Sequence, residues 1–244
     1  MANKTNKELL KKIMKASTIK ETSLLSESEI YTNEIFVPTK IPLLNLFLSG
    51  KFKGGIAGNH TAIAGASASF KSMIGLILVK TYLDHFDDAL AIIYDSEKGI
   101  TPEYLRSLGL DPARIVIKPF ATLEVLKNDI VNQLDVLQRG DHVIILIDSI
   151  SNSASSKEVK DSLDDKDTTD MTRARVIKSI FRMVTSSVAF KEIPLISINH
   201  TYSSMDQYKE DEVAGGGGIK YSATSTLRIS KLKGEKNEGG VKFR

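Results

Sequence analysis

Short apolar runs alternate with longer amphipathic segments over most of the chain. The runs are rich in Ile, Val and Leu, as strands buried on both faces are, and lie at residues 60–64, 89–94, 114–117, 142–147 and 194–198. Helical spacing of apolar side chains occurs between them, at residues 72–85, 101–108, 122–139 and 169–191. This alternation predicts an α/β fold with a mostly parallel sheet flanked by helices.

Both ends of the chain depart from this pattern. Residues 5–16 place Leu9 and Ile13 on one face of a short amphipathic helix, and a polar tether follows over residues 17–33. A second short helix is expected at residues 41–48, with Pro42 in its first turn. We therefore expect a small N-terminal helical arm over residues 1–35 and a core over residues 36–244.

The last strand pattern looks like a hairpin that is cut short. Residues 223–232 and 241–244 are joined by the turn-rich segment 234–240. The core is therefore expected to be incomplete at its C-terminal end.

Composition excludes several classes of protein. The 244 residues contain no Cys, which rules out disulfides, zinc fingers, iron–sulfur clusters and thiol nucleophiles. No apolar run approaches the roughly 20 residues of a membrane span, and the Lys-rich N-terminus lacks the apolar stretch of a secretory signal. We expect a cytoplasmic protein without a membrane partner. The net charge of +3 allows a polyanion partner but does not identify one.

The strand at residues 60–64 is followed by a phosphate-binding pattern and then by an apolar helix. The pattern consists of Gly65, Ala66, Ser67, Ala68, Ser69, Phe70, Lys71 and Ser72, with Phe70 where a P-loop usually has its second glycine. Backbone N–H groups at a helix start attract phosphate oxygens. Lys71 would contact the phosphates, and the Ser72 hydroxyl would bind Mg²⁺. The alternative is a Gly- and Ser-rich turn that happens to precede Lys-Ser.

Three further strands end in polar side chains. Asp148 ends a buried strand that we expect beside the P-loop, from which a carboxylate can hold Mg²⁺ through water; the alternative is a helix or turn cap. Glu97 could polarise a water for attack on a γ-phosphate, or could be a surface turn residue. His200 could sense that phosphate, or be structural. Carboxyl ends of parallel strands meet at one edge, so these residues are expected together.

These motifs resemble the RecA-type recombinases, and most closely the UvsX-like recombinases of bacteriophages. The resemblance is carried by residues 13–20 (IMKASTIK), 39–50 (TKIPLLNLFLSG), 65–72 (GASASFKS), 94–109 (YDSEKGITPEYLRSLG), 129–135 (DIVNQLD), 147–149 (IDS), 170–174 (DMTRA) and 198–202 (INHTY). The phage family has its own variant of the P-loop with Phe at the position of Phe70. The resemblance implies a RecA-like P-loop NTPase core.

The resemblance also implies a role for each matched position. Lys71 and Ser72 are similar to the family's phosphate and Mg²⁺ ligands, Asp148 to its Walker B carboxylate, and Glu97 to its water-activating residue. Thr101 and Tyr104 fall where the family contacts adenine. His200 falls where the family links the γ-phosphate to DNA.

Two DNA-binding loops are implied at residues 151–168 and 201–218. Candidate DNA contacts are Arg173, Arg175, Tyr202, Tyr208, Gly215, Gly216, Gly217 and Lys220, because Tyr can stack on bases, Gly admits a close backbone and basic residues attract phosphate. The second loop is acidic before Gly215, which opposes DNA binding. A solvated surface loop is the alternative.

The expected function is an ATP-dependent recombinase that forms helical filaments on single-stranded DNA and pairs it with duplex DNA. The N-terminal arm would pack on a neighbouring subunit, or else fold back on its own domain. A mediator and a single-strand binding protein are usual partners in the family, and the implied location is the cytoplasm of a bacterial host. The alternatives are a truncated fragment that binds ATP without assembling, a helicase, or a small-molecule kinase.

Overall fold

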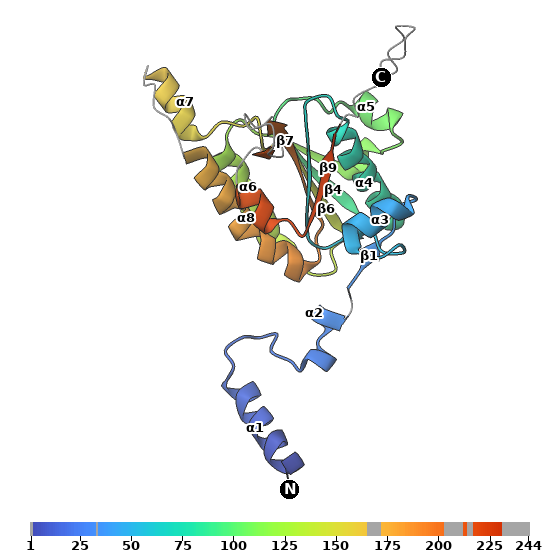
Figure 1. The fold of residues 1–244 in the computed structure, drawn as a ribbon, viewed down its shortest axis with the longest axis vertical. Coiled ribbons are helices and arrows are strands. Elements are labelled where there is room, and N and C mark those ends of the chain that lie inside the picture. Colours follow the sequence, from blue (N-terminus) through green and yellow to red (C-terminus); the bar gives the residue numbers. More distant parts are fainter. Residues whose placement is uncertain (1, 33, 165–171, 203–211, 214–216, 231–244) are drawn as a thin grey trace, which may run out of the picture. The chain divides into compact units, whose positions relative to one another are not determined.

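The computed structural model describes residues 2–32, 34–164, 172–202, 212–213 and 217–230 (Figure 1). The chain divides into two compact units, residues 1–34 and residues 35–244. The first unit contains α1 (Ala2–Ala16), the 3-10 turn η1 (Leu25–Glu27) and α2 (Glu29–Thr32). Leu9 and Ile13 of α1 are more than half exposed. The segment predicted as a plain tether therefore carries short helical turns.

A parallel sheet forms the centre of the second unit. In the described part of the chain its six parallel strands are β3 (His60–Gly65), β4 (Leu90–Asp95), β5 (Ile115–Pro119), β6 (Val143–Asp148), β7 (Leu195–Tyr202) and β9 (Ser225–Ile229). Their spatial order is β5-β4-β6-β7-β3-β9. A short strand, β8 (Glu212–Val213), pairs antiparallel with β7, and β1 (Phe36–Val37) pairs separately with β2 (Ile56–Ala57). The predicted fold class is confirmed.

Helices cover both faces of this sheet (Figure 1). One face carries α3 (Pro42–Ser49), α4 (Lys71–His85) and α5 (Pro102–Ser107), and the other carries α6 (Leu123–Val136), α8 (Thr172–Lys191) and α9 (Gly217–Ser222). Strand β6 shows why both faces are apolar. Its Ile144 and Leu146 pack with α4, whereas Ile145 and Ile147 pack with α6 and α8, because successive strand residues point to opposite faces.

Two sequence-based expectations need correction, and a third is not tested. The strand of Asp148 does not lie beside the phosphate loop, because β7 is inserted between β6 and β3. The first strand of the expected hairpin forms as β9, which pairs in parallel with β3, and the hairpin itself stays a prediction because residues 241–244 lie outside the described residues. The second correction concerns a loop. The segment expected as the first DNA-binding loop contains a helix, α7 (Ser156–Leu163).

A local sequence signal accounts for α7. The Ser155 hydroxyl accepts a hydrogen bond from the Glu158 amide at 3.1 Å, and the Glu158 carboxylate accepts one from the Ser155 amide at 2.5 Å. This reciprocal pair is a capping box, which satisfies N–H groups that have no partner inside the helix. The pattern Ser-x-x-Glu is visible in the sequence and could have predicted the helix.

Candidate nucleotide-binding site

The phosphate loop connects the buried strand β3 to the first residue of α4. Gly65 ends the strand where no side chain fits, because a Cβ atom there would lie 2.5 Å from the carbonyl oxygen of Ile229 in β9. Ala68 and Phe70 both have left-handed backbone conformations, with φ of 55° and 62°. Phe70 thus adopts the conformation that favours glycine, and the turn forms without glycine at that position.

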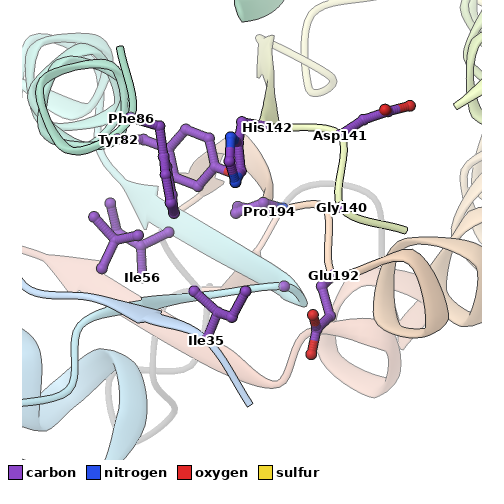
Figure 2. A pocket seen from close by; sticks show the side chains of 11 residues that line it. Ile35, Ile56, Tyr82, Phe86, Gly140, Asp141, His142, Glu192 and Pro194 are labelled. Carbon is purple, nitrogen blue, oxygen red and sulfur yellow. The ribbon is translucent and has the colours of Figure 1, made fainter. Parts of the chain in front are cut away.

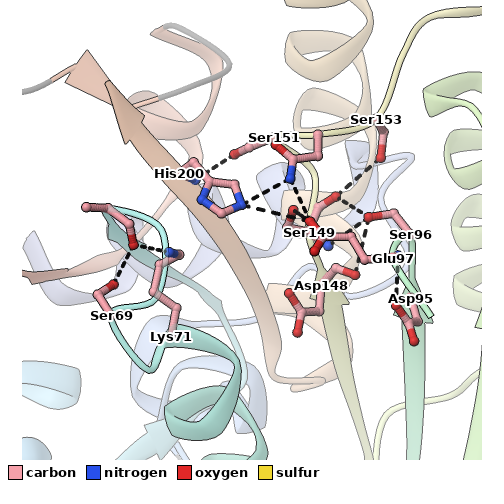
Figure 3. Close-up of polar contacts among 12 residues, drawn as sticks. Ser69, Lys71, Asp95, Ser96, Glu97, Asp148, Ser149, Ser151, Ser153 and His200 are labelled. Carbon is pink, nitrogen blue, oxygen red and sulfur yellow. Dashed lines mark hydrogen bonds and ion pairs between the residues drawn. The ribbon is translucent and has the colours of Figure 1, made fainter. Parts of the chain in front are cut away.

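Lys71 folds back over this loop (Figure 3). Its Nζ donates a hydrogen bond to the carbonyl oxygen of Ala66 at 2.6 Å, and the Ser69 hydroxyl donates to the same oxygen at 2.8 Å. Lys71 is 5% exposed, and burial lowers the pKa of its ammonium group, an effect that Asp148 and Glu97 oppose. The ammonium group is therefore held inside the loop, where a phosphate would lie.

The two predicted Mg²⁺ ligands lie near each other across the intervening strand. Burial is the largest effect on Asp148, at the end of β6, and raises the pKa of its carboxyl to about 6. The Ser72 hydroxyl, in the first turn of α4, is close enough to Asp148 to lower this pKa. Lys71 also lowers it, whereas Asp95 and Glu97 raise it further. A cation at this point would remove the repulsion among the carboxylates.

This pair fits a magnesium ion that is bound together with a nucleotide. A hydroxyl and a carboxylate are hard oxygen ligands, which Mg²⁺ prefers, and Mg²⁺ usually takes its other ligands from water and substrate phosphates. Among the described residues, no group of three or more His, Asp or Glu side chains could hold a metal alone. Ser72 and Asp148 would therefore hold the ion only together with other oxygen ligands.

Glu97 follows β4 in a tight turn that Asp95 organises. The buried Asp95 carboxylate accepts hydrogen bonds from the amide of Glu97 at 2.9 Å and from the amide of Ile100 at 3.2 Å. Ser96 joins this turn to the end of β6, because its hydroxyl donates to the Ser149 carbonyl at 3.0 Å and accepts from the Ser149 amide at 3.1 Å. Sequence reasoning assigned no role to Asp95 or Ser96. The pair Asp95-Ser96 directly before Glu97 is nevertheless a turn signal in the sequence.

Figure 3 shows His200 on β7, between the phosphate loop and the turn of Glu97. The His200 Nε2 atom lies 3.9 Å from Glu97 Oε1, and the His200 amide donates to the Ser151 hydroxyl at 2.8 Å. Burial and the neighbouring Lys71 lower the pKa of His200, which Glu97 partly opposes. The structure therefore brings together the predicted residues Lys71, Ser72, Glu97, Asp148 and His200 at one edge of the sheet.

Sequence reasoning missed Asn152, which contacts two of these residues. Its Nδ2 donates to Glu97 Oε1 at 2.7 Å and lies 3.3 Å from His200 Nε2. The residue falls in a turn of Ser and Asn after β6, and nothing in that composition distinguishes it from a surface turn. Only the convergence of β4, β6 and β7 reveals the contact.

The two predicted adenine contacts lie at the start of α5. Thr101 caps this helix, since its hydroxyl accepts a hydrogen bond from the Tyr104 amide at 3.2 Å. Leu105 in the same helix packs in the cluster that contains α4 residues. Thr101 and Tyr104 therefore belong to the face of the sheet that carries the phosphate-loop helix, and their role with adenine stays a prediction.

The predicted DNA contacts are only partly described. Arg175 is exposed on α8, whereas Arg173 donates from Nε to the Ser153 carbonyl at 3.1 Å. Tyr208, Gly215 and Gly216 lie outside the described residues. The structure gives only the backbone of Tyr202 in β7, and of Gly217 and Lys220 in α9.

The glycine run also needs a correction. The second loop was expected to extend to residue 218, but α9 begins at Gly217. A Cβ atom at Gly218 would lie 2.9 Å from the Cα atom of Lys178 in α8. Glycine at this position is explained by helix packing, and no DNA backbone is needed to account for it.

A pocket at the other end of the sheet is unrelated to this site (Figure 2). It lies by the residues that precede β6 and β7 and by the end of α4, and Figure 2 shows the stacked rings of Phe86 and His142 against it, with centroids 3.9 Å apart. Asp88 is within 2.7 Å of His142 Nδ1. The carboxyl ends of the strands, with Lys71 and Glu97, are at the opposite edge.

Comparison with known proteins matches most of the chain. The model of the RecA N-terminal domain matches residues 22–242. The chain is 45% identical over 224 residues to the "Recombination and repair protein" of Enterobacteria phage T4, covering 92% of this chain and 57% of that protein. It is 26% identical over 225 residues to Protein RecA of Malacoplasma penetrans, covering 91% and 64%. The chain thus spans less than two thirds of the length of these relatives.

None of the described helices is both long enough and apolar enough to cross a membrane.

Proposed function

This chain belongs to the RecA family, and we propose that it is the core of an ATP-dependent DNA recombinase. The observation that carries the proposal is Lys71 Nζ folded over the phosphate loop onto the Ala66 carbonyl, with Ser72 and Asp148 close to each other beside it. A phosphate-binding loop, a magnesium pair and a carboxylate at one sheet edge are the parts that phosphoryl transfer from a nucleoside triphosphate requires.

We propose that the backbone of residues 65–72 and the first turn of α4 bind the phosphates of ATP. Phosphate oxygens would replace the Ala66 carbonyl as the partner of Lys71 Nζ, which is already in place at 2.6 Å from that carbonyl. Because Lys71 is buried, little side-chain entropy would be lost on binding. Thr101 and Tyr104 would contact the adenine.

Ser72 and Asp148 would hold Mg²⁺, which neutralises phosphate charge when it is bound. Glu97 would take a proton from the attacking water as the new P–O bond forms and the bond to the ADP oxygen breaks. His200 would sense the γ-phosphate, because it lies on β7 between the phosphate loop and Glu97. The product pair would be ADP and phosphate.

We further propose that the protein binds single-stranded DNA, forms a helical filament and pairs the bound strand with duplex DNA. The name of the phage relative, a recombination and repair protein, supports this role. The exposed Arg175 and the candidate contacts Tyr202 and Lys220 would supply DNA contacts. A mediator and a single-strand binding protein would be partners, in the cytoplasm of a bacterial host.

ATP turnover with and without a poly(dT) oligonucleotide tests the proposal, with filament growth followed by light scattering. DNA-stimulated turnover and growing particles are expected, and both should disappear in Lys71→Ala. The matched control is Lys80→Ala on the same helix, whose partner Asp84 lies on the surface. Nucleotide binding without DNA-dependent turnover would reduce the function to nucleotide binding. Turnover that needs a small-molecule acceptor would instead indicate a kinase.

A further inference from the structure

One oxygen of Glu97 accepts two side-chain hydrogen bonds. Glu97 Oε1 accepts from Asn152 Nδ2 at 2.7 Å and from the Ser149 hydroxyl at 3.3 Å. The hydrogen bond from Asn152 is the shorter of the two. Among the described residues Oε2 accepts no such hydrogen bond, and a base needs one oxygen available for a proton.

The carboxylate also fixes the orientation of the Asn152 amide. If the amide were turned over, its oxygen would face the Glu97 oxygen at this short distance, and two acceptors would repel each other. The NH₂ group must therefore face Glu97. Its nitrogen carries two hydrogens and has no acceptor capacity.

This orientation determines the state of His200. The same Asn152 nitrogen lies 3.3 Å from His200 Nε2, so a hydrogen bond between them requires Nε2 to accept. A neutral imidazole with its hydrogen on Nδ1 satisfies this condition, and an imidazolium does not. The pKa of His200 is lowered by burial and by Lys71, which favours the neutral ring.

We propose that Asn152 is a positioning residue that holds Glu97 by Oε1 and keeps His200 in the Nδ1–H tautomer. Asn152 lies in the turn after β6. Its NH₂ group contacts Glu97 in the turn after β4 and His200 on β7, so it links the ends of three strands. Glu97 is thereby aimed with Oε2 available for water, and His200 presents an acceptor to Asn152. The catalytic part of this inference rests on the proposed ATPase function, whereas the tautomer does not.

The tautomer can be measured without nucleotide or DNA. The chain has four histidines, so the His200 signals in a ¹⁵N–¹H correlation spectrum of labelled protein can be assigned by comparison with a His200→Gln spectrum. Wild-type protein should show an unprotonated Nε2 and a protonated Nδ1. In Asn152→Asp the introduced carboxylate would accept, so the ring should change to Nε2–H or become protonated. The Nε2–H form in the wild type would overturn the proposal, even if no Asn152 variant folded.

Kinetics test the effect on Glu97. In Asn152→Ala, kcat for ATP should fall about tenfold while KM and the affinity for a fluorescent ATP analogue stay within about twofold, because the variant loses orientation and keeps the phosphate site. Asn128→Ala is the matched control, since Asn128 is exposed on α6, which is separated from Glu97 along the chain by α5 and β5. Asn152→Asp should be at least as slow as Asn152→Ala, because the second carboxylate repels Glu97.

The outcomes separate the two proposals. If the wild type hydrolyses no ATP but shows the Nδ1–H tautomer, the proposed function fails and the Asn152 contact stands. If the wild type hydrolyses ATP and Asn152→Ala keeps both its kcat and the wild-type tautomer, the positioning role is wrong. A parallel loss of kcat and nucleotide affinity in Asn152→Ala would also overturn it, because that result indicates a general structural role.

Discussion

Phe70 offers a direct measurement of the strain in the phosphate loop. Its backbone has φ of 62° and ψ of 20°, the left-handed region that a bulky residue avoids. The side chain is 71% exposed, so its removal loses little burial. Two substitutions separate the contributions. Phe70→Gly removes both the ring and the strain, whereas Phe70→Ala removes the ring and keeps a Cβ atom in the same conformation.

The difference between the two variants follows from their backbones. A left-handed conformation costs a non-glycine residue about 1 to 2 kcal/mol. Glycine gains about 0.5 to 1 kcal/mol of additional freedom in the unfolded chain, which offsets part of this. We expect the free energy of unfolding of Phe70→Gly to be about 0.5 to 1 kcal/mol larger than that of Phe70→Ala, so the glycine variant is the more stable. For a chain of this size the thermal midpoint should differ by about 1 to 4 °C.

Urea denaturation of both variants without nucleotide, followed by circular dichroism, measures this difference directly. The slope against urea should be equal in the two variants, since the same surface is exposed on unfolding. Equal stabilities, or a more stable Phe70→Ala, would show that the loop in solution does not hold residue 70 in the left-handed region. The expected strain would then be absent.

Three other substitutions test the remaining assignments. Lys71→Ala should weaken binding of a fluorescent ATP analogue at least about tenfold, since it removes the buried ammonium group at the phosphate loop, and an unchanged affinity would contradict the phosphate role. Glu97→Gln should bind that analogue within about threefold of wild type while ATP turnover falls about 100-fold or more, and surviving turnover would mean that another group activates water. His60 is buried between Ser197 and Ser222, and burial lowers its pKa from 6.5 to about 4. The folded state therefore binds fewer protons than the unfolded state between these values, so wild-type protein should lose about 2 kcal/mol of stability from this group between pH 7 and pH 5, a slope that His60→Gln should flatten in urea titrations.

The pattern of apolar residues along the chain predicted most of the fold. The buried parts of two central strands, residues 91–93 of β4 and 143–147 of β6, are continuous runs of Ile, Val, Leu and Ala. The family that the motifs indicated is confirmed by the match over residues 22–242. The predicted ends of the elements differ from the observed ends by a few residues. For example, α6 was predicted to end at residue 139 and ends at Val136.

Other elements depended on contacts between distant residues. Helix α9 begins in a run of glycines, which is a poor helix sequence, and it is stabilised by packing against α8 through the close approach at Gly218. The insertion of β7 between β6 and β3 could not be predicted, because strand order depends on which apolar faces pack together and the runs are nearly interchangeable. The capping box of α7 was the exception, a readable signal that was missed.

The sequence by itself determined which residues would meet at the carboxyl edge of a parallel sheet, because that depends only on local order: a strand, then a polar residue, then a helix or turn. Lys71, Ser72, Glu97, Asp148 and His200 were all identified in this way. Only the tertiary structure decided how they face one another. The proximity of Ser72 to Asp148 and the contacts of Asn152 with Glu97 and His200 depend on strand order and side-chain direction. These are set by the packing of the whole sheet, which no local pattern contains.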